Sequence, residues 1–558
     1  MVENYWQDKY PAGVSSEINI NEYRNIQSVL KESCNKFADK PAFSNFDHEL
    51  TYKELYELSE NFASYLQHFT ELQVGDRVAI QMPNILQYPI VIFGAIRAGL
   101  VVVNTNPLYT KSELEHQFND SGATALICLD SVAHLAEQVI PKTNIKTVIV
   151  TKLGDRLPII KRLLVNFSVK HIKKMVPTYH LPQAFDFNKS LLLGATKQLN
   201  EVDSNPQDVA ILQYTGGTTG VAKGAMLSHK NLIANMLQVK GLMGSNLNEG
   251  CEISVAPLPL YHIYAFTFHC MVMMLIGAHN ILITNPRDVS GLIKDISKHK
   301  FTIFTGLNTL FLGLSGHSQF KKVDFSALKL TISGGMALQK TTAQQWENIT
   351  QSAICEGYGM TEASPIVAVN PYNAIRLGSI GLPLPSTLCK MIDEEGNTLD
   401  IGVAGELCVK GPQVMLGYWQ NQQANEEIFT EDGWLRTGDI GCIHEDGYLQ
   451  IIDRKKDMIV VSGFNVYPNE LENIVAMLEQ VTQCAVIGLP HEKTGEVIKL
   501  FVVVKPEFQL SQEQIVSHMR AYLTAYKIPK LIEFRDNLPT SNVGKVLRRE
   551  LRNSEISS

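Results

Sequence analysis

The sequence has little of what marks secreted, zinc-binding or nucleic-acid-binding proteins. Its nine cysteines are scattered singly from Cys34 to Cys484, and no Cys-x-x-Cys pair occurs. This argues against a disulfide framework or a zinc site and favours reduced thiols in a cytoplasm. Positive charge is not in excess, because 49 basic and 56 acidic residues leave a net charge of -7. No global field therefore attracts nucleic-acid backbones, and no nucleic-acid partner is expected.

Long hydrophobic runs are also missing. The most apolar run, 266–278, is interrupted by His269 and falls short of the ~20 residues that a spanning helix needs. The first eight residues include acidic side chains and no apolar stretch, so no secretory signal is expected. We therefore expect a cytoplasmic protein that does not cross a membrane. The oligomeric state stays open, a homodimer included.

What the chain does contain is alternating β and α patterns. Its 558 residues are too many for one ordinary core, so at least two domains are expected. The β-rich runs 77–82, 125–129, 301–305 and 328–333 each precede turn residues and a helical pattern. This alternation predicts α/β layers with largely parallel sheets.

The pattern changes after about residue 380. Short strands with Gly-rich turns fill 390–461, which predicts antiparallel hairpins or a small β-barrel. A helix is expected from Pro468, with two strands and further helices after it. We assign 1–452 to a large N-terminal domain, 453–456 to a hinge and 457–558 to a smaller α+β C-terminal domain.

A basic segment stands apart within the large domain. Residues 161–176, KRLLVNFSVKHIKKMV, interleave five basic residues with Leu, Val, Phe, Ile and Met. As a helix this pattern is typical of a segment that lies on an anionic membrane surface. A solvated helix that packs on the core explains it equally well, so both interpretations stay open.

The strongest chemical signal is a Gly/Thr-rich loop that follows the apolar strand 209–213. Glycines let the backbone turn tightly and present N–H groups to phosphate, threonine hydroxyls add donors, and Lys223 adds a positive charge. The loop is not a Walker A motif, because no Lys-Ser/Thr pair follows Gly220. The preceding strand and the terminal lysine disfavour a flexible linker. The residues predicted to bind nucleotide here are Tyr214, Thr215, Gly216, Gly217, Thr218, Thr219, Gly220 and Lys223.

This loop resembles the phosphate-binding motif of the acyl-adenylate-forming enzymes, which include acyl-CoA synthetases, peptide-synthetase adenylation domains and firefly luciferase. Ser333-Gly-Gly and the segment from Glu356 to Glu362, EGYGMTE, resemble the adenine and metal segments of that superfamily. The resemblance implies that the Tyr358 ring and glycine backbone flank adenine, that Thr361 faces the α-phosphate, and that Glu362 holds Mg²⁺. A carboxylate beside a triphosphate indeed needs a bridging cation. The implied nucleotide-binding residues are Gly334, Gly335, Glu356, Gly357, Tyr358, Gly359, Met360 and Thr361.

A ribose-binding segment follows in the order that the resemblance requires. Trp434 to Asp439, WLRTGD, resembles it, with Asp439 accepting from the ribose hydroxyls and Arg454 assisting. The stretch 432–456 closely resembles the signature of fatty-acyl-CoA synthetases. The departures leave Asp439, Arg454 and Lys456 intact, and they fall at Arg436, Ile443, Glu445 and Gln450, where His, Trp, Pro and Lys are usual.

The C-terminal domain carries the lysine that the family uses for adenylation. Lys545, in the segment PTSNVGK, matches it, and an ammonium group there would stabilise the negative charge that builds as a carboxylate attacks phosphorus. The resemblance implies a mobile domain that rotates after adenylation, with Lys456 at the hinge. It also implies that Gly463 and Phe464 line the channel for the pantetheine of coenzyme A.

The acyl end of the site is the least defined. His262, in Pro-Leu-Tyr-His, either neutralises or orients the substrate carboxylate or is a satisfied core residue. Phe266 resembles an aromatic gate to the acyl tunnel of related enzymes. The methionines that follow, at 271, 273 and 274, suit a compliant wall around an alkyl chain but suit an ordinary core equally well.

The resemblance implies an enzyme that uses ATP and Mg²⁺ to convert a long-chain fatty acid to acyl-AMP and then transfers the acyl group to coenzyme A. Such an enzyme serves fatty-acid degradation and uptake, with peripheral contact to the inner face of the cytoplasmic membrane. One alternative is a medium-chain or aryl acid–CoA ligase. Another is a non-catalytic, membrane-associated fatty-acid-binding protein, which would be free to lose Lys545, Glu362 or the phosphate loop. All three are intact.

Overall fold

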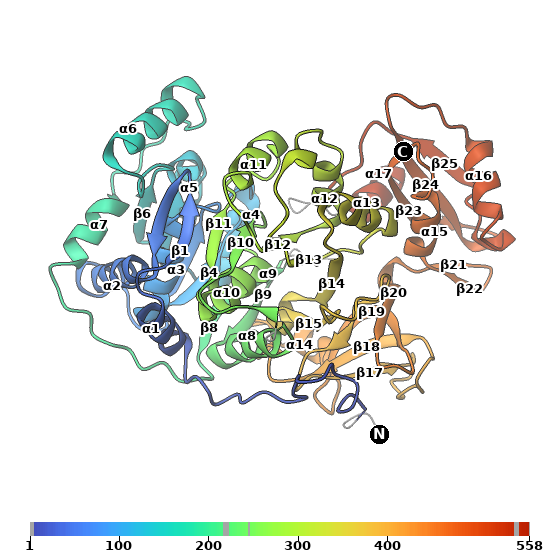
Figure 1. The fold of residues 1–558 in the computed structure, drawn as a ribbon, viewed down its shortest axis with the longest axis horizontal. Coiled ribbons are helices and arrows are strands. Elements are labelled where there is room, and N and C mark those ends of the chain that lie inside the picture. Colours follow the sequence, from blue (N-terminus) through green and yellow to red (C-terminus); the bar gives the residue numbers. More distant parts are fainter. Residues whose placement is uncertain (1–4, 216–221, 244–245, 541–545, 557–558) are drawn as a thin grey trace.

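The computed structural model describes residues 5–215, 222–243, 246–540 and 546–556 (Figure 1). One sheet has seven strands in the order β7-β6-β5-β3-β4-β8-β9, all parallel except for β9 at the edge. Consecutive parallel strands require crossovers, as the alternating sequence pattern predicted. The bounds are β3 (Arg77–Gln81), β4 (Val101–Asn104), β5 (Ala125–Leu129), β6 (Thr147–Thr151), β7 (Ala184–Asp186), β8 (Val209–Thr215) and β9 (Lys223–Ser228).

A second sheet has nine strands in the order β16-β15-β14-β13-β12-β10-β11-β1-β2. Its central six strands are parallel, and β2, β15 and β16 pair antiparallel at the two ends. The bounds are β1 (Pro41–Asn45), β2 (His48–Thr51), β10 (Ile253–Ala256), β11 (His279–Leu282), β12 (Ile303–Gly306), β13 (Leu330–Ser333), β14 (Ile354–Gly359), β15 (Ile366–Val369) and β16 (Leu382–Pro383). The prediction of largely parallel sheets is confirmed.

Helices cover these sheets, and their burial follows from their sequence. Every residue of α3 (QYPIVIFGAIR) is buried, as expected for a helix that is apolar on all sides. The amphipathic α2 begins at a capping box between Thr51 and Glu54. The bounds are α1 (Ile26–Lys36), α2 (Tyr52–Phe69), α3 (Gln87–Arg97), α4 (Lys111–Ser121), α5 (Ala133–Val139), α6 (Ile159–Phe167), α7 (Phe187–Gly194), α8 (His229–Met243), α11 (Val289–Ile296), α12 (Asn308–Ser315) and α13 (Lys340–Thr350).

The expected hairpins after residue 380 form a four-stranded antiparallel sheet in the order β17-β18-β19-β20. This sheet takes the place of the small barrel that the sequence suggested. Four strands are fewer than the about eight with which closed barrels are commonly built, so the sheet stays open. The bounds are β17 (Leu388–Ile392), β18 (Gly405–Lys410), β19 (Leu435–Ile443) and β20 (Leu449–Arg454), with α14 (Gln422–Ile428) between β18 and β19.

The last hundred residues have their own sheet and hydrophobic clusters, at the opposite end of the molecule from α6 (Figure 1). The helix predicted from Pro468 begins there, and the mixture of strands and helices agrees with an α+β unit. The bounds are β21 (Ile459–Val461), β22 (Phe464–Val466), α15 (Pro468–Val475), β23 (Val481–His491), β24 (Gly495–Val504), α16 (Gln512–Arg520), β25 (Leu531–Phe534) and α17 (Arg548–Ile556). Within the described ranges, every helix is too short or too polar to traverse a lipid bilayer.

Trp346 of α13 anchors the helical layer over the nine-stranded sheet. Its ring is fully buried among Phe304, Phe311 and Phe320, and its Nε1 donates to Thr331 of β13 over 3.2 Å. We expect Trp346→Ala to destabilise this region by about 3–5 kcal/mol, because it leaves a cavity where the indole ring was buried. The loss of stability is measured as a lower midpoint of urea-induced unfolding. The exposed Gln345→Ala on the same helix is the control, and equal midpoints for the two variants would contradict the prediction.

Candidate active site

The predicted phosphate loop is the connection of a β-hairpin. The strand before it is confirmed as β8, and the chain returns antiparallel as β9, with Tyr214 opposite Gly224 and Thr215 opposite Lys223. The connecting residues lie outside the described part of the chain. The predicted contacts of Gly216, Gly217, Thr218, Thr219 and Gly220 with nucleotide therefore stay predictions.

Helix α4 holds both ends of this hairpin connection. The Tyr214 hydroxyl donates to Asp120 Oδ2 over 2.6 Å, and His116 Nε2 lies 2.9 Å from the carbonyl oxygen of Ala222. A Cβ atom on Gly224 would lie 3.1 Å from the Tyr214 ring, so the small residue lets the tyrosine pack flat against β9. Neither Asp120 nor His116 could be predicted from sequence, because they lie about a hundred residues before the loop.

Tyr418 joins the lysine at the end of the loop to the predicted metal carboxylate. Lys223 Nζ lies 5.2 Å from the centroid of the Tyr418 ring, and the Tyr418 hydroxyl donates to Glu362 Oε1 over 2.6 Å. Glu362 is buried, and this burial raises the pKa of its carboxyl group above the usual value. Tyr418 was not predicted from the sequence, since a tyrosine beside a tryptophan is typical of an ordinary core.

The predicted adenine segments lie at the carboxyl ends of the parallel strands β13 and β14, where open α/β sheets bind ligands. Gly334 and Gly335 directly follow β13, and Gly335 has a φ of +84°. Met360 and Thr361 follow β14. At Gly359 an added Cβ would lie 2.2 Å from a backbone oxygen, so only glycine fits there.

Two buried polar groups face this region without full compensation. Within the described residues, Glu356 accepts one backbone hydrogen bond, from Leu338 over 3.1 Å, and burial raises the pKa of its carboxyl group to about 7. The Tyr264 hydroxyl is buried and has no hydrogen-bond partner among the residues that the structure describes, and its ring lies beside Gly334. Buried polar groups normally have partners, so these two are available to a ligand.

The predicted ribose carboxylate lies directly beside the predicted adenine tyrosine. Asp439 Oδ2 accepts from the Tyr358 hydroxyl over 2.6 Å, and Arg454 Nε lies 3.3 Å from Asp439 Oδ1. Asp439 on β19 and Arg454 on β20 are cross-strand neighbours, which explains their pairing. The structure therefore brings together three residues that lie up to 96 positions apart in the sequence.

These residues line a cavity of about 480 Å³ between the large α/β portion and the C-terminal residues. The predicted residues on its wall include Gly335, Glu356, Gly357 and Gly359, besides Tyr358, Asp439 and Arg454. Asn469, Glu472 and Arg548 of the C-terminal part close the other side. A cavity with backbone glycines, a carboxylate and an arginine is suited to a polar ligand with a flat ring.

Arg548 connects three segments around the predicted hinge. Its guanidinium group donates to Asp457, to Glu472 over 2.7 Å and to Asn469 over 2.9 Å. The Asn469 backbone N–H donates in turn to Asp453 Oδ2 over 2.7 Å. The network thus spans residues 453–457. Arg548 lies three positions after Lys545, which is outside the described residues.

Lys456 lies inside this segment. Its partial burial and the nearby positive charge of Arg454 lower the pKa of the Lys456 ammonium group to about 8.

His262 caps the short helix α9 (Ile263–Ala265), and its Nδ1 accepts from the backbone N–H of Tyr264 over 3.4 Å. Burial lowers the pKa of the imidazole to about 4. The ring is therefore neutral near pH 7. Of the roles left open by the sequence, neutralising a carboxylate needs a charged ring, whereas orienting one by a hydrogen bond does not.

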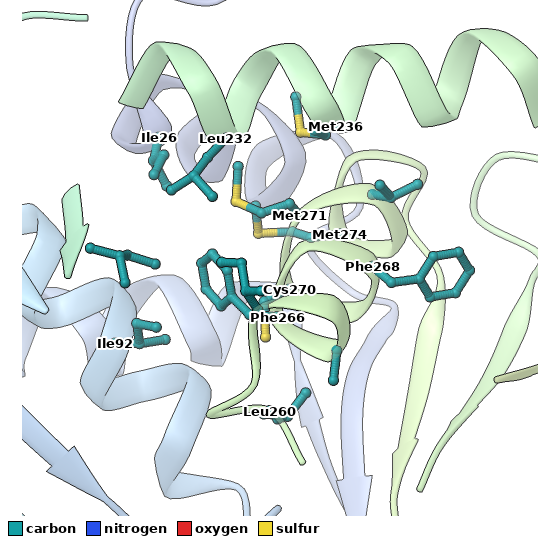
Figure 2. Packing of buried hydrophobic residues seen from close by; sticks show 14 of the residues in the cluster. Ile26, Ile92, Leu232, Met236, Leu260, Phe266, Phe268, Cys270, Met271 and Met274 are labelled. Carbon is teal, nitrogen blue, oxygen red and sulfur yellow. The ribbon is translucent and has the colours of Figure 1, made fainter. Parts of the chain in front are cut away.

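Phe266 is fully buried at the start of the π-helix η5 (Phe266–Val272), which continues into α10 (Met273–Leu275). π-Helical turns are rare and are frequent at functional sites. Figure 2 shows the Phe266 ring next to Ile92 of α3, with Met271 and Met274 facing Met236 of α8. These methionines are core residues in this structure, and their flexibility leaves the region adaptable.

The predicted pantetheine residues lie apart from the cavity. Gly463, with a φ of +84°, is in the tight turn between β21 and β22. Phe464 is exposed and stacks on Tyr526 with ring centroids 4.9 Å apart. Neither residue is on the cavity wall.

Comparison with known families gives the class of protein that this fold and site define. The model of the AMP-binding enzyme family matches residues 30–419, and that of the AMP-binding enzyme C-terminal domain matches residues 470–545. The chain belongs to the AMP-binding enzyme family.

Curated relatives match along nearly the whole chain. A long-chain-fatty-acid–CoA ligase of Escherichia coli O157:H7 is 51% identical over 552 residues, which are 99% of this chain and 98% of that protein. One of Yersinia pestis is 50% identical, with 100% of this chain and 99% of that protein covered. A feruloyl-CoA synthase of Amycolatopsis is 33% identical, with 90% and 93% covered.

Solved structures confirm the acyl-adenylate-forming fold. An ATP-bound chimera of RpMatB and BxBclM superposes with a TM-score of 0.82 at 29% identity, covering 95% of this chain and 100% of the other. The anthranilate CoA ligase AuaEII in complex with anthranoyl-AMP gives a TM-score of 0.85 at 25% identity, covering 97% and 99%.

We expect Tyr418→Phe to weaken binding of ATP in the presence of Mg²⁺ by about tenfold or more, because Glu362 loses the donor that orients its carboxylate. Binding of ATP in the presence of a chelator should change little. Calorimetric titration under both conditions measures this. Tyr448→Phe, which removes an exposed hydroxyl bound to a backbone oxygen, is the matched control. Equal losses with and without Mg²⁺ would contradict the role of Tyr418.

Proposed function

We propose that this protein activates a long-chain fatty acid with ATP, forming acyl-AMP and pyrophosphate, and then transfers the acyl group to coenzyme A with release of AMP. The observation that carries the proposal is the convergence of Tyr358, Asp439 and Arg454 on one cavity, in a chain about half identical to long-chain-fatty-acid–CoA ligases. The product would enter fatty-acid degradation after uptake.

In this proposal the adenine lies against Tyr358 and the glycine backbone of β13 and β14, and Asp439 accepts from the ribose hydroxyls. The β8–β9 hairpin connection and Lys223 hold the phosphates, and Thr361 faces the α-phosphate. His262 orients the fatty-acid carboxylate with Phe266 beside it at the entrance of the acyl site. The Lys545 ammonium group stabilises the charge that develops during attack.

A magnesium ion fits this arrangement. Mg²⁺ is commonly bound by one or two carboxylates, substrate phosphates and water, and Glu362 is a single buried carboxylate close to the hairpin that carries Lys223. Among the described residues no cluster of three or more ligating side chains exists. An ion that is bound mainly by substrate phosphates and water needs only one protein carboxylate, here Glu362, and no such cluster. When bound, the ion would neutralise phosphate charge.

We further propose that residues 457–558 rotate as one body relative to 1–452, about the hinge 453–456 with Lys456 at its centre. The rotation withdraws Lys545 after adenylation and brings Gly463 and Phe464 to the thiol of coenzyme A. The hydrogen bonds of Asn469 to Asp453 and to the carbonyl oxygen of Ile452 support this, because hydrogen bonds between two units exchange with water more readily than a shared apolar core.

A medium-chain or aryl acid–CoA ligase is the second candidate. The 33% identity to a feruloyl-CoA synthase, a protein named for an aryl acid, supports this second candidate. A non-catalytic fatty-acid binder would not need the hydrogen bonds that tie Tyr358 and Tyr418 to the two carboxylates. Peripheral contact with the cytoplasmic membrane also belongs to the proposed function, whereas a homodimer stays a prediction.

The test is acid-dependent exchange of labelled pyrophosphate into ATP, measured with saturated acids from short to long and with aryl acids. We expect exchange to be fastest with long-chain acids and thioester formation to follow the same order. Fastest exchange with an aryl or medium-chain acid would favour the second candidate. No exchange with any acid would contradict both enzyme candidates and favour the non-catalytic fatty-acid-binding protein.

We expect Lys545→Ala to reduce adenylation at least about 10²-fold while sparing thioester formation from supplied acyl-adenylate. The reason is that the lysine acts only while the acid attacks the α-phosphorus. Both half-reactions are measured separately on the same preparation. Arg549→Ala, a nearby substitution outside the Arg548 network, is the control. Equal loss in both half-reactions would contradict the proposed rotation.

A further inference from the structure

The segment formed by α6 and the π-helix η3 (Ser168–Ile172) is oriented with its apolar side outward. Neither element contains a buried residue. Seven large apolar side chains are between 58% and 76% exposed, which is unusual for one short segment: Ile159, Ile160, Leu163, Leu164, Phe167, Ile172 and Met175. A solvated helix that packs its apolar side on the core, one of the two interpretations from the sequence, is therefore wrong.

Polar contacts hold this segment on the protein instead. Asn166 Oδ1 accepts from the Gly154 backbone N–H over 2.8 Å, and its Nδ2 donates to Asp155 over 3.2 Å. Lys161 donates to the carbonyl oxygen of Phe46 at the β1–β2 turn. The polar side of the helix faces the protein and the apolar side faces away, the reverse of an ordinary surface helix. Contiguous exposed apolar patches mark surfaces that another body covers.

The positive charge of the segment indicates which kind of partner covers its exposed apolar side. Residues 156–176 contain six basic and no acidic residues, in a chain with a net charge of -7. Lys170, Lys173 and Lys174 are exposed, and within the described part of the chain no ion pair involves them. A second copy of this chain would place like charges opposite one another across a symmetric interface. An anionic lipid surface complements both the basic groups and the apolar side.

The dimensions agree with a helix that lies in the surface. The nine residues of α6 and the five of η3 extend about 21 Å, less than the ~30 Å of a bilayer core. Figure 1 places α6 at the edge of the molecule, near the opposite end from the C-terminal residues.

We propose that α6 and η3 insert their apolar side chains into the headgroup region of an anionic bilayer, with Lys170, Lys173 and Lys174 at the phosphates. The inference rests on the peripheral membrane contact in the proposed function, and it assigns that contact to one element and to apolar insertion. The basic residues recruit the protein to the surface, and Leu163, Leu164 and Phe167 retain it. A water-insoluble fatty acid would then be taken up where it is dissolved.

The test is co-sedimentation of the full-length protein with vesicles of phosphatidylcholine containing 30% phosphatidylglycerol. We expect Leu163→Gln/Leu164→Gln/Phe167→Gln to weaken partition at least about tenfold. We expect Lys170→Gln/Lys173→Gln/Lys174→Gln to weaken it by about fivefold per lysine on these vesicles and little on pure phosphatidylcholine. Leu108→Gln/Val403→Gln, which removes exposed apolar side chains elsewhere, is the matched control.

Pyrophosphate exchange with a water-soluble acid should be unchanged in these variants, which separates membrane binding from the proposed reaction. Wild-type partition that the apolar variant retains would overturn the assignment to α6 and η3 while leaving membrane contact in place. No wild-type partition would overturn both. A dimer that the apolar variant dissociates without vesicles would show that a second copy covers the surface, and would also overturn the inference.

Discussion

Two buried carboxylates, each held by a tyrosine hydroxyl at 2.6 Å, determine the geometry of the proposed nucleotide site. Tyr358 donates to Asp439, and Tyr418 donates to Glu362. Burial and the neighbouring carboxylate raise the pKa of each tyrosine, so both hydroxyls stay protonated and remain donors. A protein with a net charge of -7 must bind a polyanion through local groups, and neutral donors orient these carboxylates without adding charge.

The residues proposed to bind ligands were more predictable from the sequence than the residues that position their side chains. The strands β3, β5 and β8 and the helix from Pro468 followed from local patterns, because hydrophobic periodicity and turn residues are local signals. Tyr358 and Asp439 were predicted separately through the resemblance. Their hydrogen bond was not, since it joins positions 81 residues apart. Tyr418, Asp120 and Arg548 gave no pattern at all, because their roles exist only once distant elements pack.

The burial of side chains distinguishes between interpretations of segment 161–176 and of His262 that the sequence alone left open. The basic segment 161–176 allowed a packed or a membrane-facing helix, and hydrophobic periodicity cannot distinguish them, since it shows that one side is apolar but not what covers that side. The contacts of Asn166 and Lys161 fix which side meets the protein. At His262, burial keeps the imidazole neutral, which disfavours neutralisation of a carboxylate and leaves orientation by a hydrogen bond or a core role.

The same contrast between polar and apolar contacts bears on how one site serves two reactions. The C-terminal residues complete their own hydrophobic clusters, so the proposed rotation would leave these clusters intact. Across the hinge, the Asn469 backbone N–H donates to Asp453 Oδ2 over 2.7 Å, and Asn469 Nδ2 donates to the carbonyl oxygen of Ile452 over 3.3 Å. These bonds lie next to Lys456, the pKa of which is lowered to about 8. Each such bond has a net worth of about 1 kcal/mol against water. A few such bonds would hold one orientation and still allow the proposed rotation.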